Sequence, residues 1–126
     1  MTKIEVHQLY TSAYQKVLDI QKRTHIEVQE HRRFECIYLV EHHPVITLGR
    51  RGGLIVQNAQ SKKTSVPVVQ TQRGGLATCH NYGQLVIYPI IHIKKRKIGI
   101  KRFICLLLQS IKMAIDSLFE IEVYIS

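Results

Sequence analysis

The sequence predicts an α+β fold in which two amphipathic helices pack against a mixed β-sheet. Apolar residues recur at helical spacing in two segments, one near each end of the chain. Between them lie short runs rich in Val, Ile and Thr, separated by Gly and Pro turn signals. A chain of 126 residues is long enough to bury one hydrophobic core. We therefore expect a single domain over residues 1–126.

The first helix is expected to begin after Ser12, which forms a capping-box pattern with Gln15. Apolar side chains then recur on one helical face, at Ala13, Tyr14, Val17, Leu18 and Ile20. Nothing in the sequence stops this pattern sharply. We expect the helix to run to about Arg33.

The middle of the chain predicts four strands. They are Phe34–His42, Val45–Gly49, Val66–Thr71 and Gln84–Ile93. Pro44 separates the first two, the turn signal RRGG follows at 50–53, and residues 54–64 are polar and loop-like. Because Pro89 cannot donate a hydrogen bond, the last strand is expected to kink there or to lie at a sheet edge.

The clearest helix follows Gly99. Apolar residues hold the i, i+3, i+4 pattern from Ile100 to Phe119, with charged residues on the other side. The final EIEVYIS alternates like a strand, and the chain stops inside it. Such an ending is typical of an interrupted domain, so we expect an N-terminal portion of a larger one.

The charges are distributed unevenly. From His42 to Ile115 there is no Asp or Glu but there are twelve Lys and Arg, six of them in Lys94–Arg102. Such a segment attracts an acidic protein, a nucleic acid or a phosphorylated cofactor, although it could also be only a solvated basic face. Without acids, this region cannot supply carboxylate pairs, carboxylate metal sites or Ser-His-Asp triads.

The cysteines and the N-terminus predict a cytoplasmic protein. The three cysteines are an odd number without paired spacing, the first residues lack a signal sequence, and no apolar run could span a membrane. Cys36 and Cys105 lie among apolar residues and are expected to be buried. Cys79, His80 and the His42-His43 pair lack the spacing of metal ligands, so no metal is expected.

The segment RGGLATCH, residues 73–80, is the main candidate site. Gly74 and Gly75 let the backbone approach a ligand closely, and the Arg73 guanidinium can bind a carbonyl, carboxylate or phosphate. The plain alternative is a turn. His80 is expected to be a polar pocket residue. Adjacent residues in a strand point to opposite faces, which argues against Cys79 as a nucleophile with His80 as its base.

Three segments in this order resemble the octanoyltransferases of lipoate synthesis, which are similar in fold to lipoate and biotin protein ligases. The segments are LVEHHPVITLGRRG, PVVQTQRGGLATCHNYGQLVIYP and KKRKIGIKRF. The residues that match the family pattern are Glu41, His42, Pro44, Val45, Thr47, Gly49, Arg73, Gly74, Gly75, Thr78, His80, Gly83, Gln84, Lys95, Arg96, Lys97 and Gly99. The agreement extends from about Glu5 to Ile125.

The resemblance implies an incomplete biotin/lipoate ligase-like catalytic domain that transfers an octanoyl group from acyl carrier protein to a lysine of lipoyl domains. The implied partners are octanoyl acyl carrier protein and the lipoyl domains of 2-oxoacid dehydrogenases and the glycine cleavage system. No cofactor, membrane or nucleic acid is implied. The substrate-binding residues carried over by the resemblance are Arg73, Gly74, Gly75, Leu76, Ala77, Thr78, Cys79 and His80.

The departures from the family pattern concern the chemistry itself. The family's catalytic cysteine and lysine are expected beyond Ser126, so no catalytic residue is assigned here. Leu76 replaces a glutamine, Cys79 a tyrosine, and Asn81-Tyr82 a Gly-Pro pair. The chain could be an incomplete reading frame, a decayed relative or half of a split enzyme. Two other hypotheses are Cys79 as a substitute nucleophile, with His80 or Lys95 nearby, and a non-catalytic basic binding protein for acyl carrier protein or nucleic acid.

Overall fold

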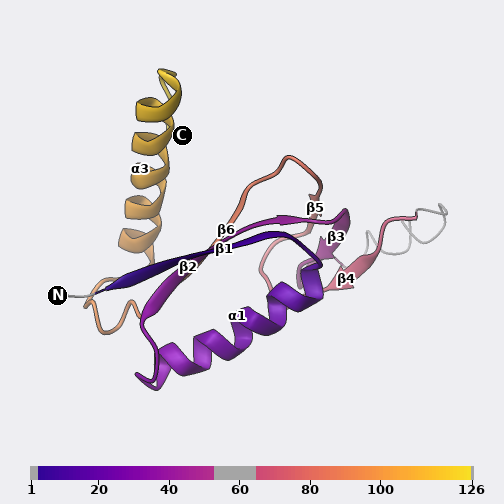
Figure 1. The fold of residues 1–126 in the computed structure, drawn as a ribbon, viewed down its shortest axis with the longest axis horizontal. Helices are drawn as coiled ribbons and strands as arrows, with labels where there is room; N and C mark the ends of the chain where they lie inside the picture. Colours follow the sequence, from indigo (N-terminus) through magenta and orange to yellow (C-terminus); the bar gives the residue numbers. More distant parts are fainter. Residues whose placement is uncertain (1–2, 53–64, 126) are drawn as a thin grey trace. The chain divides into compact units, whose positions relative to one another are not determined.

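The structure is a computed structural model that describes residues 3–52 and 65–125 (Figure 1). It divides into two compact units, Met1–Ile90 and Ile91–Ser126. The first contains α1 and six strands, and the second contains α3. Within the described residues, both β-sheets are mixed and both helices are amphipathic, which confirms the predicted α+β class. The polar segment 54–64, expected to be a loop, lies outside the described residues.

The larger core forms around a three-stranded sheet in the order β1-β2-β6. Strand β1 (Ile4–Ser12) runs parallel to β2 (Glu35–His42), and β6 (Val86–Ile90) runs antiparallel to β2. From Cys36 on, β2 alternates strictly between buried and half-buried residues, since successive side chains point to opposite faces. The buried set is Cys36, Tyr38, Val40 and His42.

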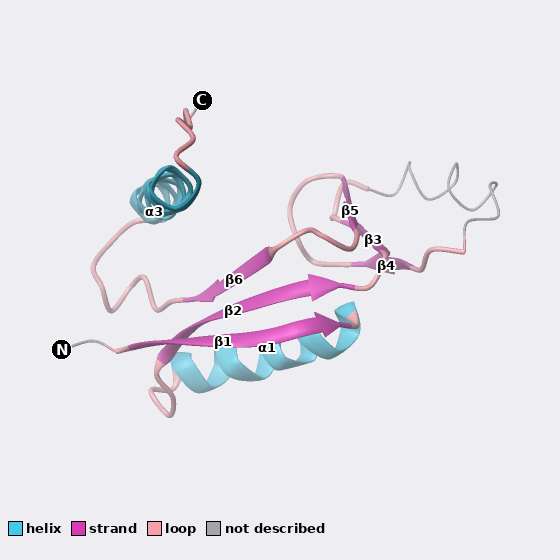
Figure 2. Ribbon diagram, turned by 45° about the horizontal axis from the view of Figure 1, so that its top comes forward, coloured by secondary structure: helices cyan, strands magenta, loops and turns pink. Residues whose placement is uncertain are grey.

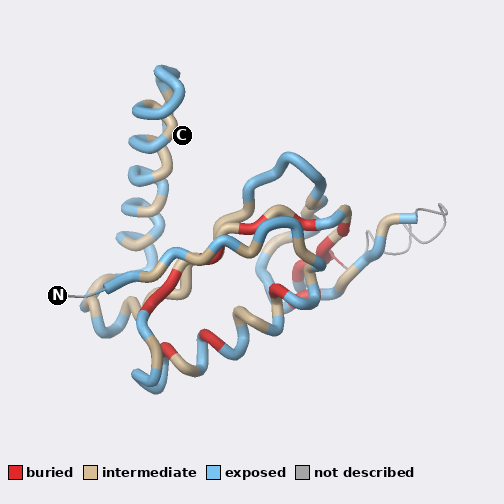
Figure 3. The backbone as a smooth tube through the Cα atoms, viewed as in Figure 1, coloured by how far each residue is buried: buried red, intermediate tan, exposed pale blue. Residues whose placement is uncertain are grey.

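Helix α1 (Tyr14–Gln29) covers that buried face (Figure 2). Val17 and Val28 are buried at the helical spacing that an amphipathic helix presents to a sheet. Thr24 is also buried, and its Oγ1 lies 2.7 Å from the Tyr38 hydroxyl, so neither polar group is left without a partner. Figure 3 shows the buried residues of this unit concentrated on β2, β3 and one side of α1.

A second three-stranded sheet has the order β4-β3-β5. Strand β3 (Val45–Leu48) is central, pairing in parallel with β4 (Val68–Gln70) and antiparallel with β5 (Ala77–His80). Because only His43 and Pro44 separate β2 from β3, the end of one sheet leads directly into the other. The chain turns at Arg50–Gly52, as the sequence predicted.

The second unit is built on helix α3 (Ile100–Phe119), which starts after Gly99 as expected. Phe103, Leu107, Ile111 and Ile115 form a half-buried stripe at i, i+4 spacing. Lys112 and Asp116 pair across one turn at 2.6 Å. Cys105 is exposed, so the prediction that it is buried was wrong.

The predicted capping box is not formed. Ala13 is the N-cap, the Ser12 hydroxyl donates to the Leu9 carbonyl, and the Gln15 amide donates to Asp19. The helix also ends at Gln29 rather than near Arg33. The chain reverses there, and His31 adopts a left-handed conformation with φ of 57°. Local hydrogen bonds thus replaced the predicted cap, because short polar side chains compete for nearby backbone groups.

Two strands were not predicted, and one predicted strand does not form. Strand β1 places Ile4 and Val6 on its more exposed side, so its pattern gave no clear signal. Strand β5 lies within the segment that was expected to be a loop. Residues 120–125 are not a strand, because α3 ends in left-handed Glu120 and the Val123 N–H donates to the Asp116 carboxylate.

The outer strands are shorter than predicted, with β6 limited to Val86–Ile90 and β4 to Val68–Gln70. Pro89 lies opposite Ile37, on the strand at one edge of the described sheet β1-β2-β6. The predicted edge position is therefore confirmed. An edge tolerates Pro since its missing N–H removes no bond from the outer side.

Candidate functional site

The Gly-rich segment is held against the end of β3 by backbone hydrogen bonds. The Gly49 N–H donates to the Leu76 carbonyl, and the Arg50 N–H donates to the Arg73 carbonyl at 2.9 Å. These bonds continue the antiparallel pairing of β3 with β5, in which Thr47 lies opposite Thr78. The segment from residue 73 to residue 80 is therefore an ordered extension of the smaller sheet rather than a free turn.

The close approach of the two chains requires glycine at position 49. A Cβ on Gly49 would lie 2.8 Å from the Gly74 carbonyl oxygen and closer still to that of Gly75. Gly75 itself has φ of 84°, a left-handed conformation that a side chain would strain. Both glycines therefore serve the same contact, one by leaving space and the other by allowing the turn.

The Arg73 side chain folds back on its own segment. Its Nη1 donates to the Gly74 carbonyl at 2.7 Å, and its Nη2 lies 3.4 Å from the Thr47 carbonyl. The sequence suggested that this guanidinium is free to bind a carbonyl, carboxylate or phosphate. In the structure the guanidinium instead hydrogen-bonds backbone carbonyls of Gly74 and Thr47, although Arg73 is exposed at the surface.

The side chains of β5 alternate between two environments. Ala77 and Cys79 are exposed, whereas Thr78 and His80 are half-buried. Cys79 and His80 consequently lie on opposite faces of the strand, as neighbours in extended backbone do. This geometry separates the Cys79 thiol from the imidazole that would have to act as its base.

His80 lies against a cluster of aromatic rings from the larger sheet and α1. Its ring stacks on Tyr14 at 6.1 Å between centroids and meets His42 edge-on at 5.3 Å. Nδ1 of His80 lies 2.8 Å from Oε1 of Gln84. Residues from α1, β2 and β5 are thereby brought together beside the Gly-rich segment.

His42 is the most enclosed member of this cluster, with none of its surface exposed. Its Nδ1 lies 3.1 Å from the Ser12 carbonyl oxygen, and its Nε2 lies 2.9 Å from the Tyr88 hydroxyl. Burial lowers the pKa of His42; the hydrogen bond to Ser12 opposes this shift, and the nearby imidazoles of His80 and His43 add to it. The ring is therefore held neutral in the folded protein.

The phenols around His42 are held in their neutral forms as well. Burial raises the pKa of Tyr88 to about 12, and it also raises the pKa of Tyr14. In both cases the guanidinium of Arg73 acts in the opposite direction, which shows that it lies within electrostatic range of the cluster. Burial thus favours the neutral forms of His42, Tyr14 and Tyr88, with the Arg73 guanidinium near the two phenols.

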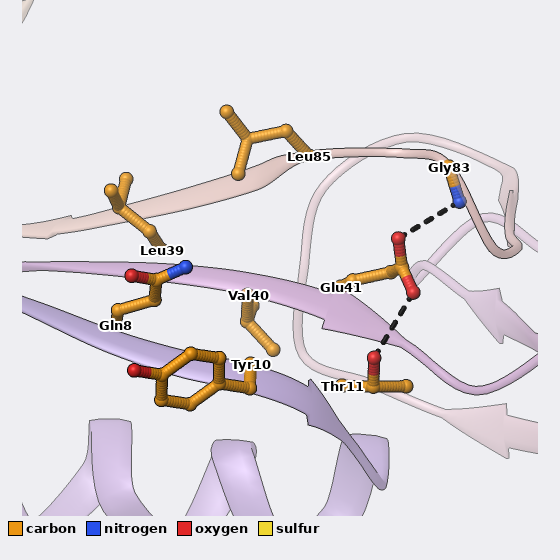
Figure 4. Close-up of a pocket in the computed structure, with 8 residues that line it drawn as sticks. All are labelled: Gln8, Tyr10, Thr11, Leu39, Val40, Glu41, Gly83 and Leu85. Atoms are coloured by element: carbon orange, nitrogen blue, oxygen red, sulfur yellow. Dashed lines mark hydrogen bonds between the residues drawn. The ribbon is translucent and has the colours of Figure 1, made fainter.

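A groove of about 490 Å³ opens beside β1, β2 and the loop after β5 (Figure 4). Leu39 and Leu85 lie toward one end of it, and Glu41 lies toward the other. The Glu41 carboxylate accepts hydrogen bonds from the Gly83 N–H and the Thr11 hydroxyl. The remaining lining residues are Gln8, Tyr10 and Val40.

Two features are absent from the described residues, a group of three metal-ligating side chains and a membrane-spanning helix. Among residues 3–52 and 65–125, no three His, Cys, Asp or Glu side chains gather closely enough to hold a metal ion. In the same residues, no helix combines the length and the apolar character needed to cross a bilayer.

Sequence reasoning found part of this cluster. It singled out His80 and Arg73, and it correctly ended the predicted strand at His42, although it did not indicate that His42 is buried. It did not anticipate Tyr14 or Tyr88 as partners. A tyrosine within the apolar strand 84–93 was a usable signal, because a buried hydroxyl needs a hydrogen-bond partner.

Comparison with known proteins identifies the family. Residues 13–126 match the lipoyl protein ligase A/B catalytic domain. The chain is 48% identical over 80 residues to an octanoyltransferase of Maridesulfovibrio salexigens, which covers 61% of this chain and 37% of the relative. It is 42% identical over 86 residues to an octanoyltransferase of Desulfotalea psychrophila, with 65% and 39% covered.

A third relative is matched over a longer stretch. The chain is 38% identical over 108 residues to an octanoyltransferase of Alkaliphilus metalliredigens, which covers 80% of this chain and 48% of the relative. The chain therefore spans between about a third and a half of the length of these relatives. The family match includes the Gly-rich segment and all the residues of the ring cluster, so the resemblance first seen in three short motifs is confirmed. The chain belongs to the lipoyl protein ligase A/B catalytic domain family, as a relative of the octanoyltransferases.

Proposed function

We propose that this chain carries the acyl-binding part of an octanoyltransferase that acts in protein lipoylation in the cytoplasm. In this proposal the segment Arg73–His80 binds the octanoyl group delivered by acyl carrier protein. The acyl group then passes to a lysine of a lipoyl domain. The observation that carries the proposal is the family match over residues 13–126, which includes this whole segment.

The local chemistry supports an acyl ligand. Tyr14 and His80 stack as two aromatic rings, and the glycines Gly74 and Gly75 belong to the same segment as His80. Aromatic rings suit an uncharged thioester and its alkyl chain, since neither carries a charge that needs a partner. No residue of the described chain is assigned as the nucleophile.

The charge of the chain supports the choice of donor. The formal net charge is +9, and the residues from His42 to Ile115 contain no acid. An acidic carrier protein would be attracted to such a surface and would bind faster and more tightly at low salt. Lys94–Arg102 is the densest basic segment and is the first candidate for that contact.

Binding of octanoyl acyl carrier protein, compared with the unacylated carrier, tests the proposal. We expect the acylated carrier to bind about tenfold more tightly, as one buried alkyl segment would provide. His80→Ala should remove most of this difference, whereas His43→Ala should keep it, because the exposed His43 side chain pairs with the exposed Tyr82. Equal affinity for the two carriers would refute the assignment.

Intact mass of the same mixture tests whether the chain accepts the acyl group. Transfer to a thiol would break the carrier thioester, form a new thioester on the protein and release the carrier thiol. A gain of one octanoyl group that hydroxylamine removes, and that Cys79→Ser abolishes, would identify Cys79 as a substitute nucleophile. An unchanged mass in a folded sample would restrict the role of this chain to binding.

A further inference from the structure

Two adjacent histidines each contact a tyrosine hydroxyl, but in contrasting surroundings. The His42–Tyr88 pair is enclosed by α1, β2 and β6, whereas the His43–Tyr82 pair is exposed. Both pairs have similar geometry, with hydrogen bonds of 2.9 and 3.1 Å and rings that meet edge-on at 5.9 Å. The second pair is therefore a natural control for the first.

The hydrogen bonds of the buried pair have a defined direction. The Ser12 carbonyl can only accept, so Nδ1 of His42 must carry the hydrogen. Nε2 of the neutral ring is then an acceptor, and the Tyr88 hydroxyl must donate to it. These two bonds link β1, β2 and β6 through Ser12, His42 and Tyr88.

The same reasoning defines the state of His80. Oε1 of Gln84 is an acceptor, so Nδ1 of His80 carries a hydrogen. Within the described residues, no hydrogen bond to its Nε2 is formed. The ring is wedged between His42 on its edge and Tyr14 on its face, which restricts its rotation.

We propose that His42, oriented by Tyr88, is a positioning residue that holds His80 with an unprotonated Nε2 beside the Gly-rich segment. In this arrangement His80 can accept a hydrogen bond from an N–H or S–H group of a ligand. Such an acceptor takes N–H, O–H or S–H donors alike, and within the proposed function the donor that it meets belongs to an amine or a thiol. The positioning role is a property of the protein without ligand, whereas the identity of the ligand rests on the proposed function.

The experiment is ring ¹⁵N NMR of the histidines in the full chain, compared with Tyr88→Phe and Tyr82→Phe. In the unmodified protein at about pH 7.5, His42 and His80 should each appear as a single Nδ1–H tautomer. Tyr88→Phe removes the hydroxyl that orients His42, so the edge-on contact of His42 with His80 should loosen and the His80 ring resonances should shift or broaden. Tyr82→Phe should leave both rings unchanged.

The outcomes separate the two proposals. An Nε2–H tautomer for His42 in the unmodified protein overturns the positioning role without recourse to any variant, even if Tyr88→Phe fails to fold. His80 ring resonances that stay unchanged in folded Tyr88→Phe overturn it as well. Addition of octanoyl acyl carrier protein should shift the His80 Nε2 resonance. If the tautomers are as expected but that resonance does not move, the positioning role is supported and the acyl-binding function fails.

Discussion

The Glu41 carboxylate accepts a hydrogen bond from the Gly83 N–H at 3.0 Å, and so connects two residues 42 positions apart in the sequence. The other carboxylate oxygen accepts from the Thr11 hydroxyl at 3.1 Å (Figure 4). One side chain of β2 thus holds the end of β1 and the loop that leads from β5 to β6. That loop lies between His80 and Tyr88, so its anchoring bears directly on the candidate site.

Glu41→Ala should release this loop. Hydrogen bonds to a carboxylate contribute more than neutral ones, and the loss of both should lower the free energy of unfolding by about 1–2 kcal/mol. Amide hydrogen exchange at Gly83 should accelerate at the same time. Thr11→Val is the control, since it removes only the second bond; protection of Gly83 that survives Glu41→Ala would contradict the anchoring role.

Gly49→Ala should destabilise the Gly-rich segment. The added Cβ would overlap the carbonyl groups of Gly74 and Gly75, which are backbone atoms that cannot rotate away. We expect a loss of about 1–3 kcal/mol, as for other overpacked sites, measured by urea denaturation. Gly74→Ala is the matched control, because a Cβ there would meet no atom within 4 Å. Similar losses for the two variants would contradict the close-packing argument.

The three cysteines should react at different rates with a maleimide. Cys79 and Cys105 are exposed, whereas Cys36 is buried, and burial raises the pKa of its thiol. Cys36 should therefore react slowly for two reasons: its thiol is buried, and less of it is present as the reactive thiolate. Intact mass should show two adducts on the folded chain and a third only after denaturation. Early labelling of Cys36 would show that the core of the first unit opens readily.

The free energy of unfolding should decrease when the pH falls below the ordinary pKa of histidine. An unfolded histidine has a pKa of about 6.5, and the pKa of buried His42 is lowered. Below about pH 6.5 the unfolded chain binds a proton at His42 more readily than the folded chain does. The contribution of neutral His42 to the free energy of unfolding is therefore complete above about pH 6.5, and it is lost as the pH falls toward the pKa of His42 in the folded protein.

A variant isolates this contribution from the other titrating groups. The groups that face His42 are Tyr14, His43, His80, Tyr88 and the nearby Arg73. His42→Gln should flatten the dependence of unfolding free energy on pH between about 5 and 6.5. His43→Gln serves as the control, and equal flattening in both variants would contradict the special role of His42.

Sequence reasoning succeeded where periodicity was strong or chemistry was local. The helix from Ile100 to Phe119 was predicted to the residue, because its apolar pattern holds over five turns. The edge position of Pro89 followed from a missing N–H. By contrast, residues 120–125 alternate like a strand but do not form one. A strand needs another strand to hydrogen-bond its backbone, whereas the Val123 N–H donates to the Asp116 carboxylate.

The sequence by itself determined the α+β class, the family and the Gly-rich segment, because each depends on residue types at short spacing. Only the tertiary structure decided that His42 is buried and that Tyr14 and Tyr88 surround it. Pairing of β2 with β6 and packing of α1 bring these side chains together from positions up to 74 residues apart. The physical reason is that a hydrogen-bond chain is specified by distance in space, which no local pattern encodes.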